Sequence, residues 1–129
     1  MAETVQFLTP RFLSASKLIG AEVRNPQDES LGSLKDLMID TASGKSAFGV
    51  LSFGGVLGLG NKLFAVPWDN FSVDGERERL VLDIARDRLK DAPGFDSDHW
   101  PDFADPAFNE RMRAHYPARN GDPRVIRPE

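Results

Sequence analysis

The chain has 129 residues, of which 40% are hydrophobic and 28% are charged, and its formal net charge is -4. This length suits one domain with a tail, and the composition predicts a body that folds. The absence of cysteine excludes disulfides, thiolate metal sites and cysteine nucleophiles. The acidic balance, with no basic run, argues against direct binding to nucleic acid or anionic lipid.

Two parts of the sequence, its beginning and its longest uncharged run, were compared with a signal peptide and with a membrane-spanning helix. Residues 1–16, MAETVQFLTPRFLSAS, lack the basic region and the apolar core of a signal peptide. The longest uncharged run lies between Lys45 and Lys62, and it is shorter than the about 20 apolar residues of a spanning helix. We therefore expect neither a signal peptide nor a membrane span.

Short apolar segments separated by turn signals fill the first three quarters of the chain. Alternating or continuous apolar residues between Asn, Asp, Pro and Gly clusters are typical of short β-strands. In chain order we expect a helical turn at 14–19, strands at 21–24, 31–40, 47–53, 63–66, 71–73 and 80–84, and a helical turn at 85–90. About six short strands at this spacing predict a mainly β fold, a small closed or half-closed barrel.

The stretch SFGGVLGLGNKLFAVPW, residues 52–68, contains four of the eleven glycines and raises the question of a phosphate-binding loop. Its glycines follow the order G-x-x-G-x-G, the reverse of the dinucleotide fingerprint. A P-loop would need lysine where Asn61 stands, and Pro67 would break a helix that began there. We therefore interpret the stretch as the wide tip of a β-hairpin.

The apolar residues of this tip have two possible roles. Val56, Leu57 and Leu59 can fold back over one mouth of the barrel, or they can form an apolar patch that contacts a partner. Trp68 is expected to pack against the barrel with its indole N–H near a polar group. If the tip is a contact surface, these four residues are candidate partner-binding residues.

Proline indicates where the barrel ends, because five of the nine prolines lie beyond residue 100. We place a boundary near Phe95, which divides the chain into a barrel domain at 14–95 and an extension at 96–129. The last residues of the extension are polar and punctuated by proline.

One helix is expected in the extension, at about 105–116. Asp105 can cap it, Pro106 suits its first position, and Pro117 ends it. Its apolar residues form one stripe at i, i+4, i+7 and i+8: Phe108, Met112, His115 and Tyr116. The stripe either covers the barrel of its own chain or docks on a second copy or another protein. In the second case Phe108, Met112 and Tyr116 are partner-binding residues.

Residues that could bind a metal ion lie just after the predicted barrel. Asp96, Asp98, His99 and Asp102 offer carboxylates and an imidazole that could hold a hard or borderline metal ion. Their spacing is not that of an EF-hand loop, and the pattern favours a solvated acidic linker over a metal site. No serine stands in a nucleophile elbow, and no catalytic set can be assembled from the sequence. We expect no enzymatic activity and no cofactor.

Several short motifs of residues 14–95 resemble the PRC-barrel family. This β-barrel module occurs in the cytoplasmic domain of the photosynthetic reaction-centre H subunit and at the C-terminal end of the ribosome maturation factor RimM. The motifs are Leu18-Ile19-Gly20, Leu31-Gly32 leading to Asp36 and Asp40, the glycine-rich run Phe53 to Gly60, Val66-Pro67-Trp68, and Leu89 to Pro93-Gly94-Phe95.

The resemblance implies a role but no reaction. The family has no shared catalytic residues, and its members resemble adaptors that dock on larger assemblies, a photosynthetic complex in one branch and a ribosomal protein in another. For this chain it implies a stand-alone barrel of the bacterial or archaeal cytoplasm. Together with the apolar tip, the striped helix and the lack of a catalytic set, the barrel pattern predicts a module that binds a protein partner or self-associates as a homodimer. Two alternatives stay open: a metal or small-ligand sensor using residues 96–105, and ribosome-linked binding of a ribosomal protein.

Overall fold

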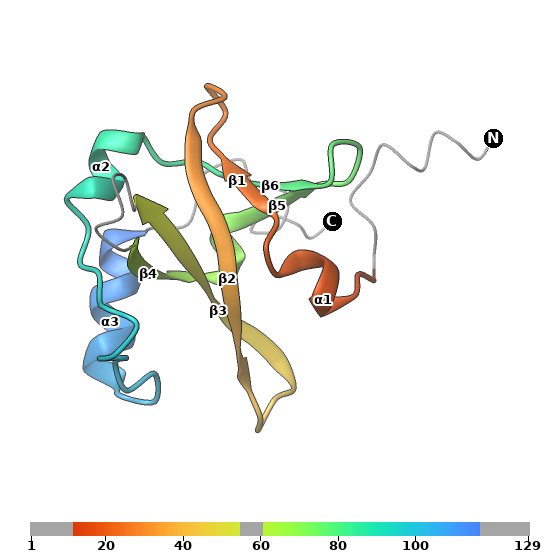
Figure 1. Cartoon of the computed structure of the whole chain (residues 1–129). Coiled ribbons are helices and arrows are strands. Elements are labelled where there is room, and N and C mark those ends of the chain that lie inside the picture. The colour runs from red at the N-terminus through yellow and green to blue at the C-terminus, as the bar shows by residue number, and fades with distance from the viewer. Residues whose placement is uncertain (1–11, 55–60, 117–129) are drawn as a thin grey trace.

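The order of elements along the chain follows the pattern of strands and turns in the sequence (Figure 1). The structure is a computed structural model, and it describes residues 12–54 and 61–116. Its elements in chain order are α1 (Ala15–Leu18), β1 (Glu22–Arg24), β2 (Ser30–Asp40), β3 (Lys45–Gly54), β4 (Asn61–Pro67), the 3-10 turn η3 (Trp68–Asn70), β5 (Phe71–Asp74), β6 (Arg79–Leu82), α2 (Arg86–Lys90) and α3 (Pro106–His115). Each predicted strand is present, with ends shifted by at most two residues.

The six strands form one sheet in the order β4-β3-β2-β1-β6-β5. All neighbouring strands are antiparallel except β1 and β6, which run parallel. The long β2 and β3 strands twist across the molecule, and β5 and β6 lie across them (Figure 1). β4 and β5 stand at opposite ends of the order, so the sheet is a curled half-barrel. This confirms the predicted mainly β small barrel, in its half-closed form.

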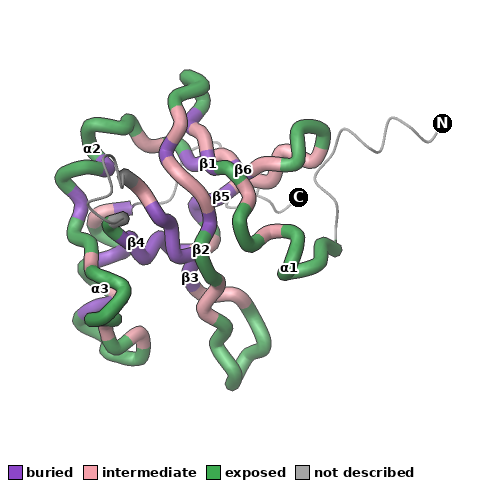
Figure 2. The backbone as a smooth tube through the Cα atoms, in the orientation of Figure 1, coloured by how far each residue is buried: buried purple, intermediate pink, exposed green. Residues whose placement is uncertain are grey.

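Apolar side chains on the inner face of this sheet make the core, which is concentrated on β3 and β4 (Figure 2). Phe71, at the start of β5, packs its ring against Gly49 of β3, where a Cβ atom would lie 2.8 Å from the ring. This contact joins the edge strand β5 to β3, the neighbour of the opposite edge strand β4. The turn η3, which links β4 to β5 along the chain, and this side-chain packing bring the two ends of the sheet together, although β4 and β5 are not neighbours in the strand order.

The predicted helix of the extension is α3, capped by Asp105, whose Oδ1 accepts a hydrogen bond from the Ala107 N–H at 3.0 Å. Its stripe is buried against the chain's own sheet, with Phe108, Met112 and Tyr116 exposed by only 6%, 2% and 4%. Of the two roles open to this helix, the structure therefore places the stripe in the core. The prediction that these three residues bind a partner is corrected, because their side chains already belong to the chain's own core.

Candidate protein-interaction site

Of the four predicted contact residues in and after the glycine-rich tip, the structure describes Trp68. Val56, Leu57 and Leu59 lie outside the described residues. Trp68 begins η3, is half-buried, and packs on Phe71 with ring centroids 5.2 Å apart. Its packing against the chain's own barrel is therefore confirmed, whereas its contact with a partner stays a prediction.

The four candidate metal ligands after the barrel are exposed side chains that the structure does not gather into one site. His99 Nδ1 lies 3.5 Å from Asp96 Oδ2, and both side chains are largely open to solvent. Asp102 instead accepts the Ala104 N–H at 3.0 Å, which is a local turn contact. Within residues 12–54 and 61–116, no three His, Asp or Glu side chains come together as a metal-binding group.

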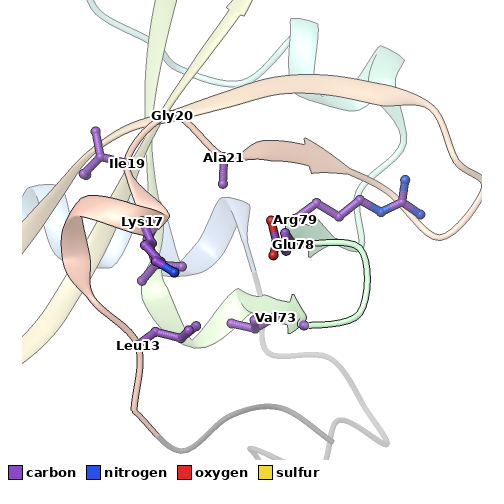
Figure 3. Close-up of a pocket in the computed structure, with 10 residues that line it drawn as sticks. Leu13, Lys17, Ile19, Gly20, Ala21, Val73, Glu78 and Arg79 are labelled. Carbon is purple, nitrogen blue, oxygen red and sulfur yellow. The ribbon is translucent and has the colours of Figure 1, made fainter. Parts of the chain in front are cut away.

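A surface hollow of about 490 Å³ lies between α1 and the turn that joins β5 to β6 (Figure 3). We call it the α1 hollow. Its apolar wall is made by Leu13, Leu18, Ile19, Ala21 and Val73. Two glycines, Gly20 and Gly75, and three charged residues, Lys17, Glu78 and Arg79, complete the lining. A hollow of this size with an apolar wall and few charges suits an inserted side chain or a short peptide segment.

Local backbone contacts hold α1 beside the sheet. The helix is a single turn, in which the Leu18 N–H reaches the Ser14 carbonyl oxygen at 3.3 Å. Gly20 follows with φ +93, a conformation that favours glycine. Its N–H donates to the Leu34 carbonyl oxygen of β2 at 2.7 Å, and the Leu34 N–H donates to Ala21 at 3.0 Å. The sequence Leu-Ile-Gly thus turns the chain sharply and joins the hollow's wall to the core strand β2.

Large apolar side chains are exposed around α1 to an unusual degree. Among the described residues, five large hydrophobic side chains are exposed, and three of them flank this helix. Phe12 is 82% exposed, Leu13 40% and Ile19 39%. α1 itself has no buried residue. Exposed apolar groups that cluster on one face, next to a hollow, are typical of a surface that another molecule covers.

The charged residues of the α1 hollow differ in whether they form ion pairs within the chain. Arg79 is held by two carboxylates, Asp28 at 3.3 Å and Asp74 at 3.4 Å. By contrast, no ion pair in the described part of the chain includes Lys17 or Glu78. The rim therefore offers one uncommitted cation and one uncommitted anion.

Asp74 keeps its negative charge beside Arg79 at neutral pH. Burial acts to raise the pKa of its carboxyl, but several contacts act in the opposite direction. The backbone N–H and guanidinium of Arg77 donate hydrogen bonds to it, and the charges of Arg77 and Arg79 add attraction. The net effect lowers the pKa of Asp74 below its ordinary value of 3.8. The Arg79 side chain thus stays anchored at the hollow's edge.

A second hollow, of about 440 Å³, lies between the far end of the β2–β3 hairpin and the segment that leads into α3. Ile39, 50% exposed, and Phe48 of the core contribute to its wall. Its one carboxylate, Asp40, accepts the Ala42 N–H at 2.9 Å. In this second hollow the Asp40 carboxylate is used in a local turn, and Ile39 is the one large exposed apolar residue of the lining. The α1 hollow is therefore the stronger candidate for a binding site.

The α1 hollow was not predicted from the sequence. Leu18, Ile19 and Gly20 were identified only as residues typical of the fold, although Ile19 is exposed beside the hollow. A usable signal was present in Phe12 and Leu13, two large apolar residues directly before the cap of a short polar helix. Glu78 carries no such signal, because only the folded sheet brings its turn next to α1.

None of the helices in the described ranges is long and apolar enough to cross a membrane.

The half-barrel sheet and its short flanking helices define the class of this protein, and comparison with known families specifies it. Residues 10–89 match the family described as PRC-barrel domain, and this is more than half of the chain. The chain therefore belongs to the PRC-barrel family, as the resemblance implied.

Two further comparisons complete this placement. No curated protein matches the chain. A solved structure of a Pseudomonas aeruginosa protein, RimM, described as a 16S ribosomal RNA processing protein, is similar with 18% identity and a TM-score of 0.41. The similarity covers 60% of this chain and 47% of that chain, so the match spans about half the length of that protein.

Proposed function

We propose that this chain is a non-enzymatic protein-interaction module that docks on a protein partner through the α1 hollow. The observation that carries the proposal is the exposure of Leu13 and Ile19 at the wall of the hollow. Apolar side chains surrounded by a polar rim are the usual anatomy of a protein interface. Burying the two side chains on a partner removes apolar surface from water, which favours binding by about 25 cal/mol per Å² before the costs of association.

The composition of the wall supports a binding role without catalysis. The hollow is lined by aliphatic side chains and glycines, together with Lys17, Glu78 and Arg79. Arg79 is engaged by Asp28 and Asp74, so it is held in place by its own chain. A wall of this kind packs against a partner and fixes its orientation by charge, whereas nucleophilic catalysis needs an activated nucleophile beside a base.

A photo-crosslinking experiment in the native cell tests this proposal. A photoreactive phenylalanine analogue replaces Ile19, and a control protein carries it at Asp87, which is 95% exposed on α2. We expect a discrete protein adduct from position 19 that is absent from position 87. A second substitution, Leu13→Asp, should abolish the adduct because it places a charge on the apolar wall. Identical adducts from positions 19 and 87 would overturn the proposal.

The mass of the adduct identifies the partner. A ribosomal protein would support the ribosome-linked alternative, and a second copy of the chain would support self-association. A bacterial cytoplasmic location is part of the same proposal. The sensor alternative has less support, because Asp96, His99 and Asp102 are not assembled into one site in the described structure.

A further inference from the structure

We infer that the partner of the α1 hollow is a second copy of this chain, docked by a two-fold axis that places the two hollows face to face. The inference rests on the proposed function, because it uses the same surface. It names the occupant of that surface, which the proposed function leaves open.

The two uncommitted charges at the rim of the hollow favour a second copy as the partner. Lys17 belongs to α1, and Glu78 belongs to the turn that joins β5 to β6. Figure 3 shows them on two different sides of the hollow. In a two-fold interface, a contact of residue i with residue j is repeated as a contact of j with i. Lys17 of each copy can therefore face Glu78 of the other, and both pairs form together.

Charge balance favours this occupant over a strongly charged partner. A basic partner surface would leave Lys17 facing like charge, and an acidic one would do the same to Glu78. A second copy offers one charge of each sign, at the same separation as on the first copy. Arg79 does not disturb this balance, because Asp28 and Asp74 hold its guanidinium.

The apolar side chains on the same surface also favour a second copy as the partner. Leu13 and Ile19, which are 40% and 39% exposed, stand beside the hollow that they help to line. One face thus carries both projecting aliphatic side chains and a recess that accepts such side chains. A surface that presents both features is self-complementary, as an isologous interface requires.

Analytical ultracentrifugation of the full chain tests the inference with a charge swap. Four proteins are compared: the unmodified chain, Lys17→Glu, Glu78→Lys, and the double variant. Each single change sets like charges against each other twice per dimer, so we expect the dimer dissociation constant to rise at least about tenfold. The double variant exchanges the two signs and should return to within about threefold of the unmodified chain.

Lys90→Glu on α2 is the matched control, because it also reverses a lysine but lies away from the hollow (Figure 1). We expect it to leave the dimer dissociation constant unchanged. Thermal unfolding of every variant verifies that the fold is retained, so that a lost dimer is not a lost structure. Recovery in the double variant cannot come from misfolding of either single variant.

The remaining outcomes separate the inference from the proposed function. An unmodified chain that stays monomeric at all concentrations overturns the inference. A dimer that neither single substitution weakens also overturns it. If the chain is monomeric while position 19 crosslinks to a different protein, the inference fails and the proposed function stands. If position 19 gives no specific adduct and no dimer forms, both fail.

Discussion

Leu63 and Phe95 hydrogen-bond to each other through their backbones in both directions. The Leu63 N–H donates to the Phe95 carbonyl oxygen at 2.9 Å, and the Phe95 N–H donates to that of Leu63 at 2.8 Å. Leu63 lies on β4, an edge strand, and the bridge satisfies groups that an edge would leave unpaired. The family match ends at residue 89. Phe95 lies beyond that residue, so a segment outside the matched range covers part of this edge strand.

The burial of α3 predicts that the extension stabilises the barrel. The Phe108 ring contacts those of Phe48 and Phe103 at centroid distances of 5.8 Å and 5.4 Å. Phe108→Ala should therefore lower the free energy of unfolding by about 3–5 kcal/mol, because it leaves a cavity in a packed core. Urea denaturation followed by circular dichroism measures this change. Arg113→Ala, exposed on the same helix, is the control and should stay within about 0.5 kcal/mol. Equal stability of the two variants would show that α3 does not belong to the core.

Gly32 of β2 supports a second prediction, on backbone geometry. Its φ is +113, and a Cβ atom there would lie 2.0 Å from the Ser52 carbonyl oxygen of β3. Gly32→Ala must displace backbone as well as adopt a strained φ, so we expect a loss of more than about 3 kcal/mol in unfolding free energy. Gly44→Ala is the matched control, since φ is +78 there but nothing lies within 4 Å. Its loss should be about 1 kcal/mol, from strain alone. Similar losses at both positions would contradict the steric argument.

The strands and turns were predictable because their signals are local. Period-two alternation and Asn, Pro and Gly clusters place each strand end without knowledge of its neighbours. The stretch at residues 45–54 and its partner at 61–67 are one such case, in which the predicted hairpin partners are β3 and β4. The tail helix was also recognisable, since Asp105 and Pro106 are a standard start.

What each apolar surface packs against could not be predicted from the same local signals. The stripe of Phe108 and Met112 has the same sequence pattern whether it covers its own sheet or a partner, so both alternatives were open from the sequence. The α1 hollow depends on the turn at Glu78 returning beside Lys17, across about 60 residues of chain. Tertiary contacts of this kind follow from the pairing of β1 with β6, a parallel pair that no local motif indicates.

Asn25 supports a third prediction, on the turn between β1 and β2. This residue is 3% exposed. Its Oδ1 accepts the N–H groups of Gln27 and Glu29 at 3.1 Å and 2.9 Å. Its Nδ2 donates to Glu29 Oε1 at 2.7 Å and to the Ile84 carbonyl oxygen at 3.2 Å. One amide thus joins the turn to the end of the β6 segment.

Replacing Asn25 should lower the free energy of unfolding, because its buried hydrogen-bond partners would be left unpaired. Asn25→Ala leaves the Glu29 N–H and the Ile84 carbonyl oxygen without this partner, and we expect a loss of about 2–4 kcal/mol in unfolding free energy. Asn25→Asp keeps the acceptor but loses both donated bonds, and it sets a second carboxylate beside Glu29. It should lose stability with rising pH as that carboxyl ionises. Gln27→Ala, on the exposed side of the same turn, is the control for urea denaturation. A stability of Asn25→Ala equal to that of the control would contradict the role of the amide.

Tyr116, the only tyrosine of the chain, supports the last prediction, which concerns alkaline pH. Its side chain is buried at the end of α3, and its hydroxyl has no hydrogen-bond partner among the described residues. Burial raises the pKa of Tyr116 above its ordinary value of 10.0, since the phenolate would lose its hydration. The folded chain therefore keeps this proton more tightly than the unfolded chain.

This pKa shift makes stability fall as pH rises through and above 10.0. Below that pH the hydroxyl is neutral in both states and the full contribution is present; above it the unfolded chain releases the proton first, which favours unfolding. A phenolate absorbance titration follows Tyr116 directly, because no other tyrosine contributes. The native titration should lie above that measured in denaturant. Tyr116→Phe should remove this part of the alkaline slope and preserve or raise neutral-pH stability, since it deletes an unpaired buried hydroxyl. A native tyrosine that titrates at its ordinary value would show that α3 does not bury this side chain in solution.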